Sequence, residues 1–217
     1  MLLSLLRGLP EYTRRVQQRN YCRENPMPAR LRGKNLGIIG LGRIGTATAL
    51  RAKAFGLKVI FYDPYKDDGY DKSLGIRKVD TLHDLARLSD IVSIHTPLTK
   101  ETENMIDDSF FKIIKPDSIL INTARGSIID LSALRNAMKK KIIKAAGLDV
   151  LPIEPSDDSQ QLIVEWENNE EWLRGRLIVT PHVGFYSPEA LKEMRIKASI
   201  EVKRVLEGKP PRNLVNP

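Results

Sequence analysis

The chain has 217 residues, of which 41% are hydrophobic and 29% charged, a composition that excludes a disordered chain. Its net charge of +8 is compatible with an anionic ligand, but no basic run is interleaved with aromatic residues, which disfavours nucleic acid as a partner. The single cysteine excludes an internal disulfide, and no stretch approaches the roughly 20 apolar residues that span a bilayer. We therefore expect a cytoplasmic protein with a basic surface and no membrane partner.

The first element predicted along the chain is one amphipathic helix over residues 2–18. Its apolar stripe consists of Leu2, Leu5, Leu6 and Leu9, and such a stripe needs a partner surface. Residues 23–34 contain two prolines and are predicted to be a connector.

Short apolar runs then alternate with helical patterns. The runs are predicted to be buried strands at Leu36–Ile39, Val59–Tyr62, Ile91–His95, Ile119–Ile121, Ala145–Val150 and Leu177–Val179. The helices are predicted at Ile44–Phe55, Leu82–Leu88, Asp108–Ile114 and Leu131–Lys140. This alternation predicts the α/β class, with a doubly wound parallel sheet covered by helices on both faces.

The alternation stops after residue 155. Residues 156–176 are polar and acidic and are predicted to be an inserted loop or short helix, without a role that we can argue. Residues 188–207 form a last long helix, with Pro188 near its start and Gly208 past its end.

The first strand leads directly into a glycine-rich turn with the pattern G-x-G-x-x-G. Gly40 allows the tight turn, Gly42 lets the backbone approach a pyrophosphate, and Gly45 lets the helix pack against the strand. The free N–H groups near Arg43 and Ile44, at the helix N-terminus, are suited to hold phosphates. Glycine-rich turns are common, but a strand, turn and helix in this order predict a Rossmann dinucleotide-binding unit.

An acidic residue at the end of the second strand predicts NAD as the cofactor. Asp63 lies 18 residues after Gly45, where a carboxylate binds the adenosine ribose hydroxyls and repels the 2′-phosphate of NADP. The alternative is that Asp63 only begins a turn before Pro64. Thr96, after the strand at Ile91–His95, is a further cofactor contact or else an ordinary loop residue before proline.

Three polar residues at other strand ends suit chemistry beside a nicotinamide. Arg125 offers a planar fork for a carboxylate, and His182 can exchange a proton near neutral pH. A nearby carboxylate such as Glu154 would stabilise the imidazolium. The other two histidines, His83 and His95, lie where a structural role is the plainer interpretation.

The motifs in their order resemble those of the D-isomer-specific 2-hydroxyacid dehydrogenases. The matching segments are residues 37–45 (GIIGLGRIG), 122–126 (NTARG), 147–150 (GLDV) with 154–155 (EP), and 180–184 (TPHVG). Residues 49–56 and 61–65 look most like the family's C-terminal-binding-protein branch, which includes NAD-sensing corepressors.

The resemblance implies residue roles and a partner. Arg125 would bind the substrate carboxylate, His182 would be the acid/base, and Glu154 would be its partner. The family motifs also place a set of residues beside the cofactor: Thr123, Ala124, Arg125, Asp149, His182 and Gly184. The substrate would be a small 2-keto or 2-hydroxy acid, and the protein a homodimer formed through its NAD-binding domains.

The resemblance also implies a division of the chain. Residues 1–30 would be an interdomain helix and connector left from a substrate domain, whose preceding segment is missing. Residues 31–184 would be the NAD-binding domain, and residues 185–217 a helix returning towards the substrate domain. The corepressor branch usually has tryptophan after its His-x-x motif, where this chain has Phe185.

Three functions remain open on the sequence. The first is NAD-dependent reduction of a 2-keto acid, because Arg125, Glu154 and His182 are all present. The second is a nucleotide-dependent interaction protein of the corepressor type. The third is a truncated product that binds NAD or dimerises without turnover.

Overall fold

A computed structural model of the protein describes residues 1–24, 28–212 and 214. The chain divides into two units, Met1–Pro181 and His182–Pro217. Residues 1–24 belong to the first unit, and the predicted division after residues 30 and 184 stays a prediction. No helix among the described residues is long and apolar enough to cross a membrane.

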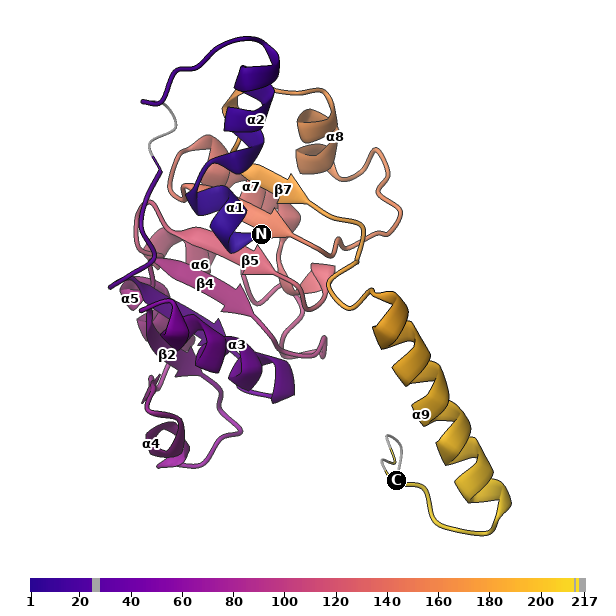
Figure 1. Cartoon of the computed structure of the whole chain (residues 1–217). Coiled ribbons are helices and arrows are strands. Elements are labelled where there is room, and N and C mark those ends of the chain that lie inside the picture. Colours follow the sequence, from indigo (N-terminus) through magenta and orange to yellow (C-terminus); the bar gives the residue numbers. More distant parts are fainter. Residues whose placement is uncertain (25–27, 213, 215–217) are drawn as a thin grey trace. The chain divides into compact units, whose positions relative to one another are not determined.

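The first unit is built on a parallel sheet of seven strands in the order β3-β2-β1-β4-β5-β6-β7 (Figure 1). The strands are β1 (Asn35–Ile39), β2 (Lys58–Tyr62), β3 (Arg77–Lys78), β4 (Ile91–Ile94), β5 (Ile119–Asn122), β6 (Ala145–Leu148) and β7 (Leu177–Val179). The strand order reverses between β1 and β4, so their carboxyl ends form the crevice where ligands of such sheets lie. The six predicted strands are confirmed within one or two residues at their ends.

Helices cover both faces of the sheet, as the alternation predicts. The helices of this unit are α1 (Leu2–Leu6), α2 (Leu9–Gln17), α3 (Arg43–Ala54), α4 (Tyr70–Leu74), α5 (Leu82–Leu88), α6 (Asp108–Ile113), α7 (Leu131–Lys139) and α8 (Gln161–Glu167). Successive strand residues point to opposite faces, so Ile38 of β1 packs with α1 and α3 while Ile39 packs with α5, α6 and α7. The two buried clusters make this a doubly wound fold.

The N-terminal segment differs from the single helix that its pattern predicts. Gly8 adopts φ 65° and separates α1 from α2, because this left-handed conformation interrupts an α-helix. Leu5 and Leu6 are buried against the sheet, whereas Leu9 is 52% exposed. The partner surface of the leucine stripe is therefore largely the chain's own sheet.

Two further elements were not predicted. The two-residue β3 extends the sheet at its β2 edge, and the short helix α4 precedes it in the chain; neither carries an apolar run. In residues 156–176, α8 and a 3₁₀ turn at Glu171–Leu173 bury Leu162, Ile163 and Leu173 in the core. The short helix, one of the two predicted possibilities for this segment, is therefore confirmed as α8, and the segment belongs to the core.

The second unit is formed mainly by α9 (Pro188–Leu206). The Ser187 hydroxyl caps the helix by accepting the Ala190 N–H, and Gly208 follows the helix end with φ 75°. No described residue of α9 is buried, and its exposed apolar side chains include Met194, Ile200 and Val202.

Candidate functional site

The glycine-rich turn after β1 is shaped by its three glycines. Gly40 has φ 87°, and a Cβ there would lie 2.8 Å from Thr96 Cγ2. A Cβ on Gly45 would lie 2.1 Å from the Gly40 carbonyl oxygen, so only glycine lets α3 start this close to β1. A Cβ on Gly42 would meet nothing within 4 Å. The middle glycine therefore faces open space that a ligand can enter.

The N-terminus of α3 opens onto this space. Gly42 is the N-cap, Arg43 and Ile44 begin the helix, and the Thr46 N–H makes the first helical bond to the Gly42 carbonyl. The N–H groups of a helix's first turn have no helical acceptors and carry a partial positive charge. The open cradle at Gly42 therefore fits the pyrophosphate of a dinucleotide.

Asp63, just after β2, is hydrogen-bonded to the same turn. Its Oδ2 accepts the Leu41 N–H at 2.8 Å, and its Oδ1 accepts the Tyr65 N–H at 3.0 Å. The carboxylate is half-buried. Asp63 therefore stabilises the turn before Tyr65, as one interpretation of the sequence predicts. It also connects the loop after β2 to the loop after β1.

Two buried polar atoms at the end of β4 have no hydrogen-bond partner among the described residues. They are Thr96 Oγ1 and His95 Nδ1. An unsatisfied buried polar atom is costly unless a ligand or water completes it. Because the Thr96 methyl group lies beside Gly40, its orphaned hydroxyl fits a bound cofactor at the crevice.

His95 is held in a structural position, as the sequence suggests. Its Nε2 lies 2.9 Å from the Ser93 hydroxyl, and burial lowers the pKa of the imidazole to about 4. The ring is therefore neutral at neutral pH, and a proton-transfer role near pH 7 does not suit it.

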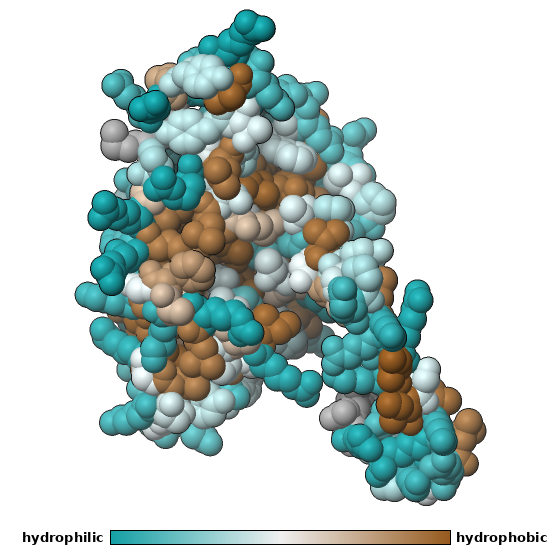
Figure 2. Space-filling view, in the orientation of Figure 1, coloured by the Kyte–Doolittle hydropathy of each residue, from teal (hydrophilic) through white to brown (hydrophobic). Residues whose placement is uncertain are grey.

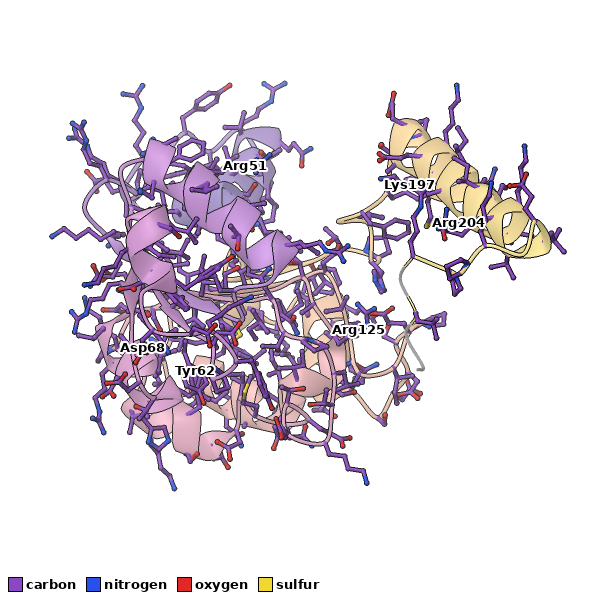
Figure 3. The ribbon with its side chains drawn as sticks, turned by 90° about the horizontal axis from the view of Figure 1, so that it is seen from below. Arg51, Tyr62, Asp68, Arg125, Lys197 and Arg204 are labelled. Atoms are coloured by element: carbon purple, nitrogen blue, oxygen red, sulfur yellow. The ribbon has the colours of Figure 1, made fainter. Side chains whose placement is uncertain are left out.

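The loop after β5 presents Thr123, Ala124 and Arg125. The buried Asn122 side chain organises it, accepting the Ala124 N–H at 3.0 Å and donating to the Arg125 carbonyl at 2.8 Å. The exposed guanidinium of Arg125 donates to the Ala124 carbonyl at 2.6 Å. Figure 3 shows Arg125 apart from Tyr62 of β2, because β1 and β4 lie between β2 and β5 in the sheet.

The loop after β5 and the segment after β6 are in direct contact. A Cβ on Gly126 would lie 1.9 Å from the Leu151 carbonyl carbon, so the two backbones touch. Glu154 Oε1 accepts the Leu151 N–H at 2.7 Å. Arg125 and Glu154 are thereby carried on two adjoining backbone segments.

Asp149 follows β6 and is 4% exposed. It accepts a hydrogen bond from the Thr180 hydroxyl, and its N–H donates to the Asn122 carbonyl at 2.9 Å. These bonds connect the ends of β5, β6 and β7. An acidic residue at this position can accept a hydrogen bond from a carboxamide such as that of nicotinamide.

His182 is the first residue of the second unit. It has φ 53°, a conformation that few non-glycine residues adopt, and its ring packs edge-on against Phe185 with 6.0 Å between centroids. Gly184 lies between these two residues. The arrangement of His182 with Arg125 and Glu154 stays a prediction.

Two residues that organise this region were not singled out from the sequence. Asn122 was considered only as part of a motif, although its place two residues before Ala124 is the usual signal of an asparagine-capped turn. Tyr65, whose hydroxyl donates to the Glu101 carboxylate, carries no sequence signal because the partner is distant along the chain.

Comparison with known proteins gives a consistent result. The profile of the family described as "D-isomer specific 2-hydroxyacid dehydrogenase, NAD binding domain" matches residues 1–184. The chain is 36% identical over 216 residues to a D-3-phosphoglycerate dehydrogenase of Methanocaldococcus jannaschii. It is 40% identical over 186 residues to a glyoxylate reductase of Thermococcus litoralis.

The matches cover only part of these relatives. The aligned regions are 100% and 86% of this chain but 39% and 53% of the two relatives. Among solved structures, the D-lactate dehydrogenase of Lactobacillus jensenii with NAD⁺ superposes with a TM-score of 0.86 at 29% identity. That match covers 100% of this chain and 66% of the enzyme.

Proposed function

Because the chain belongs to the D-isomer-specific 2-hydroxyacid dehydrogenase family, through its NAD-binding domain, we propose that it is an NAD-dependent oxidoreductase that reduces a 2-keto acid to a D-2-hydroxy acid. The observation that carries the proposal is the dinucleotide cradle, where Gly42 faces open space and Asp63 is tied to the glycine-rich turn. In a dinucleotide-binding fold of this kind, a pyrophosphate site together with a carboxylate for the ribose hydroxyls is what NAD requires.

In this proposal the cofactor occupies the crevice beyond the strand ends. The first turn of α3, from Gly42 to Gly45, holds the pyrophosphate, and Asp63 accepts the ribose hydroxyls. The ends of β4, β5 and β6 complete the site with Thr96, Thr123, Ala124 and Asp149. NADH, when bound there, supplies a hydride to the carbonyl carbon of the substrate.

Two side chains act on the substrate, and a third supports one of them. Arg125 binds the carboxylate of the 2-keto acid and orients its carbonyl group. His182 donates a proton to the carbonyl oxygen as the alcohol forms. Glu154 is the partner of His182 that the family motifs imply.

A homodimer formed through the NAD-binding unit is part of the proposal. Supporting it, Figure 2 shows hydrophobic side chains gathered on the face of the first unit between α2 and α3. Val16 on α2 and Phe55 at the end of α3 are 46% and 55% exposed. An exposed apolar patch of this kind is typical of a protein–protein interface. Sedimentation equilibrium should give twice the chain mass, and the mass of a single chain would contradict the dimer.

A cytoplasmic location and a place near the C-terminal-binding-protein branch are further parts of the proposal. The location rests on the single cysteine, Cys22, which is free and exposed. The branch rests on residues 49–56 and 61–65. An interaction role of the corepressor type is the second candidate, favoured by the exposed apolar residues of α9.

The deciding experiment uses the purified 217-residue chain. Titration with NADH, followed by nicotinamide fluorescence, should show binding. A panel of 2-keto acids should then oxidise the bound NADH, and His182→Ala should abolish turnover without preventing binding. His83→Ala, on the exposed face of α5, is the matched control and should keep full activity.

The alternatives give different results. NADH binding without turnover, rescued by adding the substrate-domain segment that family members carry, would favour the truncated product. Nucleotide-dependent capture of a defined peptide, without turnover in either form, would favour the interaction protein. Failure to bind NADH would overturn the proposal.

A further inference from the structure

One hydrogen bond joins the two loops that flank the glycine-rich turn. The Tyr65 hydroxyl, in the loop after β2, donates to the Glu101 carboxylate, in the loop after β4. β2 and β4 pair with the two sides of β1, so these loops lie on either side of the turn that β1 leads into. In a doubly wound sheet the adenosine half of a dinucleotide lies between such loops.

Tyr65 is also connected to the turn itself. Its backbone N–H donates to Asp63 Oδ1 at 3.0 Å, while Asp63 Oδ2 accepts the Leu41 N–H at 2.8 Å. A continuous series of hydrogen bonds therefore runs from the glycine-rich turn through Asp63 and Tyr65 to Glu101.

The loop that carries Glu101 has a defined shape. The Thr102 hydroxyl donates to the Pro97 carbonyl at 2.6 Å and accepts the Thr99 N–H at 2.8 Å. The Glu103 N–H donates to the Thr99 carbonyl at 2.9 Å. These bonds close a turn around residues 99–103, so the carboxylate of Glu101 is presented from an ordered backbone.

The carboxylates of Glu101 and Asp63 both affect the Tyr65 side chain. The pKa of Tyr65 is raised above its usual value, chiefly by its hydrogen bond to Glu101 and to a smaller extent by the charges of Glu101 and Asp63. The cation next along the chain, Lys66, lies 5.0 Å from the centre of the Tyr70 ring. Because Asp63 and Glu101 are both hydrogen-bonded to Tyr65, two carboxylates lie on the loops between which the ribose would lie.

We propose that Glu101, positioned by Tyr65, is a second determinant of cofactor choice that acts with Asp63 against the 2′-phosphate of NADP. A 2′-phosphate carries close to two negative charges at neutral pH, so each neighbouring carboxylate adds repulsion. The ribose hydroxyl of NAD carries none. This inference rests on the proposed cofactor role of Asp63 and extends it to a residue on another loop.

The test compares the affinities of the full chain for NADH and NADPH. Glu101→Gln removes the charge but leaves an oxygen that can accept the Tyr65 hydroxyl. It should leave NADH affinity unchanged and strengthen NADPH binding about three- to tenfold at low salt, where the Debye length is about 30 Å. At about 0.15 M salt the gain should shrink to about twofold or less, because the Debye length falls to about 8 Å.

Tyr65→Phe tests the positioning role, because it removes the hydrogen bond and keeps the Glu101 charge. Its NADPH-to-NADH affinity ratio should rise by less than that of Glu101→Gln, while the melting temperature stays unchanged. Glu103→Gln removes the same charge from the same loop and is the matched control, with a smaller expected change.

The outcomes separate this inference from the proposed function. If wild type binds NADH and Asp63→Ala relaxes the preference while Glu101→Gln does not, the role of Glu101 is wrong and the proposed function stands. A change in Glu101→Gln that does not depend on salt, or that Glu103→Gln reproduces, also overturns it. If wild type binds neither nucleotide, both proposals fail.

Discussion

Asp63 accepts the backbone N–H of Leu41 at 2.8 Å, across 22 residues of chain. The residue proposed to select NAD is thus also a structural part of the turn proposed to hold the pyrophosphate. Asp63 is hydrogen-bonded to the turn, so a substitution there can change both the charge near the ribose and the structure of the turn. Two different substitutions are needed to separate these effects.

The first prediction separates them at Asp63. Asp63→Asn keeps an acceptor and removes the charge, so it should relax the bias against NADPH with little loss of stability. Asp63→Ala also leaves the Leu41 N–H without its acceptor and should lower the free energy of unfolding by about 1–3 kcal/mol. Fluorescence titrations and urea denaturation would measure the two effects, and an unchanged nucleotide preference in both variants would leave Asp63 as a turn residue only.

The second prediction contrasts two glycines of the same motif. Gly42→Ala should fold normally, because φ is −75° and a Cβ would meet nothing within 4 Å, but it should weaken NADH binding at least tenfold by obstructing the pyrophosphate. Gly45→Ala would put a Cβ 2.1 Å from the Gly40 carbonyl oxygen and should cost about 1–3 kcal/mol of stability. Thermal melts and NADH titrations would check the contrast, which equal stability losses in both variants would contradict.

The third prediction concerns pH. Burial lowers the pKa of His95 from 6.5 to about 4, so the unfolded chain takes up this proton at a higher pH than the folded protein. The stability that depends on neutral His95 is fully present above about pH 6.5 and is lost as pH falls towards 4, by up to about 3 kcal/mol. The free energy of unfolding, measured by urea denaturation between pH 4 and pH 7, should fall less steeply with decreasing pH in His95→Gln than in wild type. Parallel curves for variant and wild type would contradict this.

The fourth prediction concerns Arg176, which precedes β7. Its guanidinium donates to four backbone carbonyls, those of Met138, Ile143, Lys144 and Trp172, each at 2.9 Å. Arg176→Lys keeps the charge but cannot reproduce this fork, so we expect a loss of about 2–4 kcal/mol in the free energy of unfolding. Arg174 is exposed and lies two residues earlier in the chain, so Arg174→Lys is the control. It should change the free energy of unfolding by less than about 0.5 kcal/mol.

Local sequence patterns predicted most of the fold. The strands were found because each contains a short run of apolar residues that is largely buried, and α5 was found at its observed bounds, Leu82–Leu88. β3 was missed because Arg77 and Lys78 have no apolar pattern and pair only with β2 at the sheet edge. The break at Gly8 was missed because the leucine spacing continues through it.

Part of the candidate site could likewise be predicted from local sequence, and part could not. The glycine-rich turn is encoded within residues 40–45, since strand, turn and helix follow one another directly along the chain. The contact between Gly126 and Leu151 and the bond between Tyr65 and Glu101 could not be predicted, because each joins segments that only the strand order brings together.

The sequence by itself determined that the chain forms an α/β dinucleotide-binding fold with an acidic residue after its second strand, because these features depend on local periodicity and short spacings. Only the tertiary structure decided that Asp63 is bonded to the turn, that Leu5 and Leu6 are covered by the chain's own sheet, and that Glu101 is hydrogen-bonded to Tyr65. Those relationships depend on which parallel strands become neighbours, and strand order arises from packing over the whole unit rather than from any one segment.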